Sequence, residues 1–128
     1  MLSGRTDHGD ARHAVRMLGV AQAAAFAVTG ITVTIGPLSL HELSGQPGLG
    51  GVLLAVFILA GGAGALVAGR AMRRVARRRV LVASHLTYGL AGFAAAAAGA
   101  AHSPGLIIAA AIPLGFGHGG ALLGRSLA

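Results

Sequence analysis

Arginines are the side chains with the clearest chemical meaning in this sequence. Six of the ten arginines lie in "GRAMRRVARRRV", residues 69–80, and the chain has no lysine. Guanidinium groups bind phosphate, so this segment could hold either nucleic acid or the anionic headgroups of lipids. Basic grooves for nucleic acid usually interleave aromatic residues with the charges, and this segment contains none. We therefore expect no nucleic-acid partner and favour the lipid bilayer, with anionic headgroups at the Arg-rich segment.

The other residues that could do chemistry do not form a recognisable site. The six histidines form neither an HxxxH nor an HExxH pair, and the chain has no cysteine. Zinc sites and disulfides are therefore not expected. No nucleophile–base set and no phosphate-binding loop is apparent. We expect no catalytic residue, no metal and no cofactor, and so a protein that is not an enzyme.

The composition is typical of membrane helices. The chain is 55% hydrophobic and 10% charged, whereas soluble proteins carry roughly 25% charged residues. No charge occurs in the 24 residues from Met17 to Leu40, and as a helix they would extend about 36 Å, enough to cross about 30 Å of hydrocarbon. A cleaved signal peptide is disfavoured because the run is long, no small-x-small site follows it, and further apolar runs come later.

Three more uncharged apolar runs follow, and none keeps the period of two that strands require. We predict an all-α, polytopic membrane protein with a cytoplasmic tail at 1–16 and a four-helix transmembrane unit at 17–128. Its helices are expected at about 17–40, 48–69, 80–101 and 104–124, with an Arg-rich cytoplasmic loop at 69–79. Pro104 is placed to begin the last helix.

The placement of charge predicts the orientation. If the four runs alternate in direction, the tail, the Arg-rich loop and the C-terminal end share one side, and all ten arginines lie there. The opposite loops contain Glu42 and no arginine. Positive charge is retained on the cytoplasmic side. We therefore expect both termini in the cytoplasm and a multi-pass protein of the cell inner (plasma) membrane.

Few polar residues lie within the predicted spans, and three of them could line a solute pathway: Thr29, Thr32 and His118. Threonine hydroxyls usually bond back to their own helix, and a structural hydrogen bond is the simpler role for His118. No aspartate or glutamate lies within a span. Small residues recur every four positions and favour close helix packing. They are Gly61, Ala65 and Gly69, then Gly115 with Gly119, and Gly120 with Gly124.

The Arg-rich loop resembles the loop between helices 2 and 3 of the major facilitator superfamily, whose signature runs G-x-x-x-D-R-x-G-R-R. Four positions keep that signature: Gly69, Arg74, Arg77 and Arg78. Arg73 stands where the family has aspartate, and Ala76 replaces the second glycine. In the family this aspartate takes part in a charge network at the cytoplasmic gate, so Arg73 reverses the charge at that position.

The resemblance covers the first four of the family's usual twelve helices. It implies a transport protein, or a truncated or split portion of one, that moves a small solute only when completed by further helices. Self-association or a partner membrane subunit would then be required. The alternative is a non-transporting scaffold or accessory subunit whose Arg-rich loop binds anionic lipid or an acidic partner.

Overall fold

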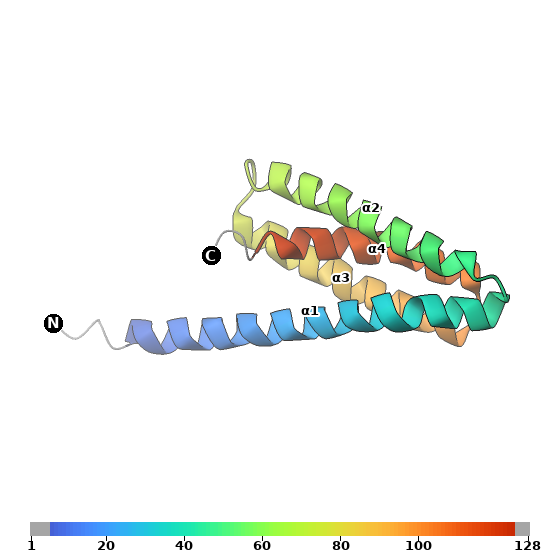
Figure 1. The fold of residues 1–128 in the computed structure, drawn as a ribbon. Coiled ribbons are helices and arrows are strands. Elements are labelled where there is room, and N and C mark those ends of the chain that lie inside the picture. Colours follow the sequence, from blue (N-terminus) through green and yellow to red (C-terminus); the bar gives the residue numbers. More distant parts are fainter. Residues whose placement is uncertain (1–5, 125–128) are drawn as a thin grey trace.

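Four helices joined by short turns make up the described part of the chain. The computed structural model describes residues 6–124 (Figure 1). The helices are α1 (Thr6–Ser44), α2 (Gly48–Ala71), α3 (Arg77–Ala100) and α4 (Pro104–Leu122), and no strand occurs within residues 6–124. All four are long and apolar enough to cross a membrane. The predicted all-α fold with four membrane helices is confirmed.

Two helix boundaries follow from local chemistry. α4 begins at Pro104, whose missing N–H is not needed in the first turn. Before it, the Ser103 hydroxyl accepts a hydrogen bond from the Leu106 N–H at 3.5 Å. After α1, Gly45 adopts a φ of +66°, and its N–H donates to the His41 carbonyl at 2.9 Å. Glycine tolerates this left-handed backbone, which ends the helix.

The helices extend beyond the apolar runs into the polar segments. α1 begins at Thr6, so most of the segment expected as a tail is helical, although residues 1–5 lie outside the described part. The Arg-rich segment expected as a loop at 69–79 contains only a short turn, because α2 ends at Ala71 and α3 begins at Arg77. A hydrophobic run shows only the part of a helix that lies in lipid. Alanine and arginine have high helix propensity, so the helix continues beyond the run into water.

α4 lies between α2 and α3 and packs against both (Figure 1). At the α2–α4 crossing, a Cβ added at Gly119 would collide with the Gly61 carbonyl oxygen. One added at Gly64 would collide with the Phe116 carbonyl oxygen. Small residues allow backbones to approach this closely, as is common in membrane helices. Helices α2, α3 and α4 therefore form one tightly packed body, called the three-helix body below.

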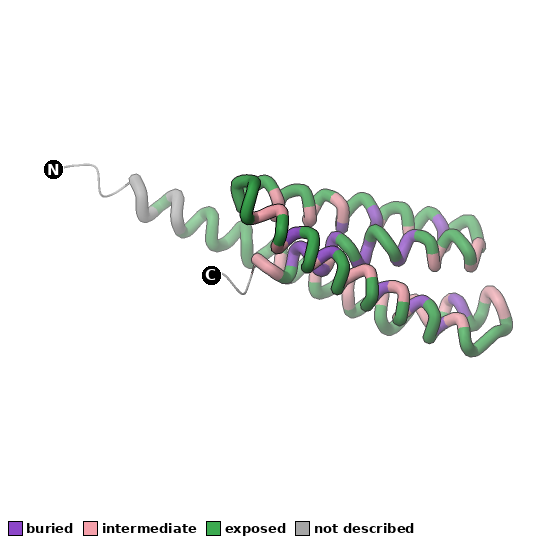
Figure 2. The backbone as a smooth tube through the Cα atoms, turned by 90° about the horizontal axis from the view of Figure 1, so that it is seen from above, coloured by how far each residue is buried: buried purple, intermediate pink, exposed green. Residues whose placement is uncertain are grey.

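α1 joins the three-helix body mainly through its C-terminal half. Leu40 is fully buried, and Pro37 lies so close to α2 that a Cβ on Gly50 would be 2.8 Å from the Pro37 Cβ. The most apolar window of α1 is 0% buried, against 44% for that of α4. In Figure 2 the coloured positions that follow the grey start of α1 are mostly exposed, and the buried positions lie mainly on the other helices. α1 is thus the least packed of the four helices.

The start of α1, the turn between α2 and α3, and the end of α4 lie at one end of the bundle (Figure 1). The turns from α1 to α2 and from α3 to α4 lie at the other end. The described arginines of α1 and of the Arg-rich segment therefore occupy the same end, which is called the arginine end below.

Candidate functional site

A polar cluster joins α1 to the three-helix body. Thr29 of α1, Tyr88 of α3 and His118 of α4 meet there with the backbone carbonyl of Ala25. The Tyr88 hydroxyl lies 2.8 Å from Thr29 Oγ1 and 3.0 Å from the Ala25 oxygen. Thr29 Oγ1 lies 2.8 Å from the Ala25 oxygen and 3.3 Å from His118 Nδ1. Three helices thus converge on four hydrogen-bonding contacts, near the middle of the apolar part of α1.

The hydrogens available within the polar cluster bear on the tautomer of His118. The four contacts of the polar cluster share one hydroxyl hydrogen from Thr29 and one from Tyr88, and the Ala25 carbonyl can only accept. If Nδ1 carries a hydrogen, it donates to Thr29, Thr29 donates to the Ala25 carbonyl, and Tyr88 donates to either oxygen. If Nδ1 were bare, Thr29 would have to choose between His118 and the carbonyl. The network therefore favours a hydrogen on His118 Nδ1.

Aromatic rings flank the imidazole of His118. The Phe57 ring of α2 has its centroid 5.5 Å away, and the Tyr88 ring of α3 has its centroid 5.6 Å away. Tyr88 reaches this place because Gly117 lets α3 approach α4. A Cβ on Gly117 would lie 2.6 Å from the Tyr88 backbone nitrogen. The polar cluster is therefore built on close helix packing as well as on polar side chains.

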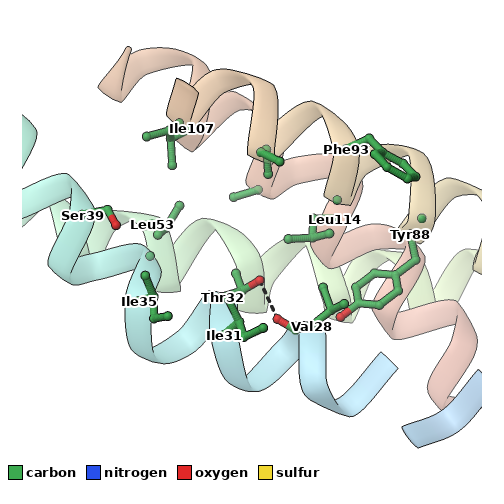
Figure 3. Close-up of a pocket in the computed structure, with 17 residues that line it drawn as sticks. Val28, Ile31, Thr32, Ile35, Ser39, Leu53, Tyr88, Phe93, Ile107 and Leu114 are labelled. Carbon is green, nitrogen blue, oxygen red and sulfur yellow. Dashed lines mark hydrogen bonds between the residues drawn. The ribbon is translucent and has the colours of Figure 1, made fainter. Parts of the chain in front are cut away.

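A groove of about 600 Å³ runs between α1 and α3 from the polar cluster toward the end opposite the arginines. Its wall on α3 carries small residues, Gly89, Gly92 and Gly99, and a Cβ added there would meet no other described side chain or neighbouring helix within 4 Å. Tyr88 and Leu114 line it in Figure 3, together with Val28 and Thr32 of α1. Unlike the glycines of α4, those of α3 therefore face open space.

Of the three predicted pathway residues, the structure brings two together and leaves one apart. Thr29 and His118 both belong to the polar cluster. Thr32 lines the groove, and its hydroxyl donates to the Val28 carbonyl at 2.9 Å (Figure 3). Both threonines bond back to their own helix, as expected.

The residues of the signature-like segment lie at the arginine end, away from the polar cluster. Arg73 and Arg74 are exposed in the turn after α2, and Arg78 is exposed in the first turn of α3. Arg77 Nη2 donates to the Gly124 carbonyl at 3.4 Å, which ties the start of α3 to the end of α4. Gly69 faces Leu123, whose Cδ1 would lie 3.9 Å from an added Cβ.

The small residues singled out for packing lie along both faces of α4. Against α2, Gly119 meets Gly61 and the backbone of Ala65, and Gly115 meets the Phe57 carbonyl. Against α3, an added Cβ at Gly120 would collide with the Ser84 side chain, and one at Gly124 would lie 3.4 Å from Leu81. Each spacing of four therefore places both members on one contact surface.

The sequence prediction did not include Tyr88 and Phe57 among the site residues. Tyr88 is the only tyrosine of the chain, and it is 5% exposed. Its position at a depth similar to that of Thr29 is a signal that could have indicated the contact. Phe57 gave no such signal, because an aromatic residue in an apolar helix is ordinary.

Comparison with known protein families gives a match over most of the chain. The family model described as Major Facilitator Superfamily matches residues 18–126. No curated protein and no solved structure matches the chain. The matched range contains α2, α3, α4 and the apolar part of α1, and thus the polar cluster and the groove. The resemblance stated from the Arg-rich loop is confirmed.

Proposed function

The chain belongs to the Major Facilitator Superfamily, and on this premise we propose that it moves a small solute across a membrane once further helices complete it. It is a multi-pass membrane protein with four spanning helices. Transporters of this family rock two six-helix halves around a midplane site, and each half consists of two inverted three-helix repeats. Four helices provide one repeat and the first helix of the next.

The observation that carries the proposal is the open side of α1. In the repeat relationship α4 is the counterpart of α1, and α4 packs against both other helices of its body. By the same relationship, α1 should pack against helices five and six. Its most apolar window is instead 0% buried, and the groove of about 600 Å³ lies beside it. Further helices would cover this side.

The solute pathway is proposed to pass the polar residues of α1 and α4. In this proposal Thr29 and His118 would lie near the bilayer midplane, where this family binds solutes, and Thr32 would continue the line into the groove. The rest of the groove is almost entirely apolar. Such a surface favours solutes with a large apolar part over sugars, which require many hydrogen-bonding groups.

The arginine end is proposed to face the cytoplasm, with the protein in the plasma membrane. Retention of arginine on the cytoplasmic side is the physical basis. The exposed side chains of Arg73, Arg74 and Arg78 would then meet anionic lipid headgroups, each contributing about 1 kcal/mol. The arginine at position 73 gives the loop an anchoring role in place of a carboxylate gate network.

Solute flux into proteoliposomes tests the proposed function. The purified chain is reconstituted alone, and again together with a polypeptide that carries helices five to twelve of a family member. With a panel of radiolabelled solutes, we expect uptake above protein-free vesicles only in the second case. Uptake by the chain alone would contradict the need for completion. Absence of uptake in both cases, with the complex shown to form, would contradict transport.

A further inference from the structure

The groove between α1 and α3 is about as long as one leaflet of a bilayer. Its lining extends on α1 from Val28 to Ser39 and on α3 from Tyr88 to Gly99. With a rise of 1.5 Å per residue, each of these stretches is about 16 Å long. One half of a hydrocarbon core of about 30 Å measures about 15 Å. The groove therefore covers the depth of a single leaflet, from the polar cluster to the end of the helices opposite the arginine end.

The groove is too narrow for a helix. Its volume of about 600 Å³, distributed over about 16 Å, corresponds to a cross-section of about 37 Å². A helix with its side chains is about 10 Å across and requires about 80 Å². An extended hydrocarbon chain requires about 20 Å², because non-bonded carbon atoms approach one another to about 4 Å. The groove therefore accommodates one extended chain, with room for part of a second, and excludes a helix.

The polar groups in the inner part of the groove already have partners. The Thr32 hydroxyl donates to the Val28 carbonyl at 2.9 Å, and the Tyr88 hydroxyl lies 3.0 Å from the Ala25 oxygen. The remaining lining is almost entirely apolar. Apolar cavities do not retain water, because water needs two or more polar partners. The groove therefore suits an apolar occupant.

The groove opens sideways between α1 and α3. Ile31 and Ile35 of α1 and Phe93 of α3 line it (Figure 3), and each of these residues is more than half exposed. In a protein that spans a membrane, such side chains meet lipid tails, which are as apolar as leucine. An acyl chain of the surrounding leaflet can therefore enter the groove from the side without passing through water.

The charge at the outer end of the groove bears on the headgroup of the lipid. Glu42 is exposed and lies three residues after Ser39, so the two residues share one face of α1. Segments 41–48 and 99–105, which form this end of the bundle, contain no arginine and no acidic residue besides Glu42. A carboxylate attracts the ammonium group of a zwitterionic phospholipid and repels an anionic headgroup. This end therefore has the opposite preference to the arginine end.

We propose that the groove binds a zwitterionic phospholipid of the leaflet opposite the arginine end, with an acyl chain between α1 and α3 and the ammonium group near Glu42. Within a bilayer, binding rests on the fit of the chain against the groove walls and not on its removal from water. The inference goes beyond the proposed function, because the lipid binds whether or not a solute moves. An apolar solute that enters the groove would compete with this lipid.

Quenching of the emission of Tyr88 tests the site. Tyr88 lines the inner end of the groove, and it is the only tyrosine in a chain without tryptophan. The full chain is placed in nanodiscs of phosphatidylcholine that contain a fraction of phosphatidylcholine brominated near the ends of its acyl chains. Bromine quenches the emission of a ring that it contacts. We expect stronger quenching than from the same lipid brominated near its ester groups.

Groove-filling variants separate the bound lipid from the lipid around the protein. Gly92→Leu places a side chain in the groove, where an added Cβ would meet no other described side chain or neighbouring helix within 4 Å. It should remove most of the quenching. Gly99→Leu obstructs the outer end of the groove and serves if Gly92→Leu does not fold. The matched control is Gly62→Leu, at an exposed position of α2 outside the groove, which should leave the quenching unchanged.

The headgroup is tested with phosphatidylglycerol brominated at the same positions. We expect weaker quenching than with phosphatidylcholine, and a smaller difference between the two lipids in Glu42→Gln. Stronger quenching by phosphatidylglycerol or by a brominated free fatty acid would overturn the proposal, as would equal quenching in the unmodified chain and Gly92→Leu. Gly92→Cys detects a second copy in the groove. Disulfide-linked dimers of this variant, with no quenching of Tyr88 in the unmodified chain, would overturn the proposal as well.

Discussion

Replacing Gly64 with alanine is expected to lower the free energy of unfolding by about 2 kcal/mol, within the range for overpacked cores. The added Cβ would collide with the Phe116 carbonyl oxygen. This atom belongs to the backbone of α4, so no side chain can rotate to make room. α2 and α4 must separate instead, and the contact that organises the three-helix body is lost. Unfolding in mixed micelles with increasing dodecyl sulfate, followed by the emission of Tyr88, measures the loss.

Gly62→Ala is the matched control, because Gly62 lies two residues away on the same helix and is exposed. A Cβ added there would meet no other described side chain or neighbouring helix within 4 Å. Both substitutions bring the same gain in helix propensity, about 1 kcal/mol in water. The difference between the two variants therefore reports the contact with α4. Equal stability of the two variants would show that α2 and α4 do not pack as described.

Replacing Gly117 with alanine is expected to disrupt the polar cluster and the α3–α4 contact together. The added Cβ would lie 2.6 Å from the Tyr88 nitrogen and 3.0 Å from the Ser84 carbonyl oxygen. α3 must move away from α4, which takes the Tyr88 hydroxyl out of reach of Thr29 and Ala25. We expect a loss of stability of about 2 kcal/mol and a changed tyrosine emission in the folded state. Because the chain has one tyrosine and no tryptophan, the emission reports this site alone.

Gly105→Ala provides the comparison on α4, since an added Cβ there would have no described neighbour from another helix or side chain within 4 Å. Its emission should match that of the unmodified chain, and its stability should not fall below that of the unmodified chain. Tyr88→Phe separates the two effects of Gly117→Ala, because it removes the hydroxyl and keeps the ring. If Gly117→Ala left the emission and the stability as they are, the close approach of α3 to α4 would be wrong.

The number and class of the helices could be predicted from the sequence because apolar runs of sufficient length have few alternatives in a membrane. The ends of the helices were harder to predict from the sequence. α1 continues back to Thr6, and α3 already begins at Arg77, because helix propensity does not stop where hydrophobicity does. A hydropathy pattern predicts the part of a helix that lies in lipid, and it does not predict how many further turns extend into water.

The site was only partly predictable for a related reason. Thr29 and His118 were recognisable as polar residues within apolar spans, where a polar side chain needs a partner. The partner itself, Tyr88, comes from another helix, and its rotation relative to α1 depends on how Gly117 packs. The groove depends on the tilt of α1 against α3, and this tilt cannot be predicted from the sequence of either helix alone. Contacts between helices therefore required the structure.

The glycines include some whose packing role was predicted correctly and others that face open space. Spacing of four pointed to Gly115, Gly119 and Gly61, and these lie where α2 and α4 cross. The glycines of α3, at positions 89, 92 and 99, instead line the groove. Small residues permit a close approach, but the presence of a neighbouring helix decides whether it happens.

Accessibility of single cysteines tests the central claim most directly, namely that the four helices form a transporter-family unit with the arginine end in the cytoplasm. Three exposed positions in or beside the turns are replaced one at a time: Gln46, Ala76 and Ala101. Intact cells are treated with a membrane-impermeant thiol reagent, and permeabilised cells provide the full signal. We predict labelling from outside at Gln46→Cys and Ala101→Cys, with Ala76→Cys labelled only after permeabilisation. Labelling of Ala76→Cys alone in intact cells would reverse the orientation, and labelling of all three would contradict the four spans.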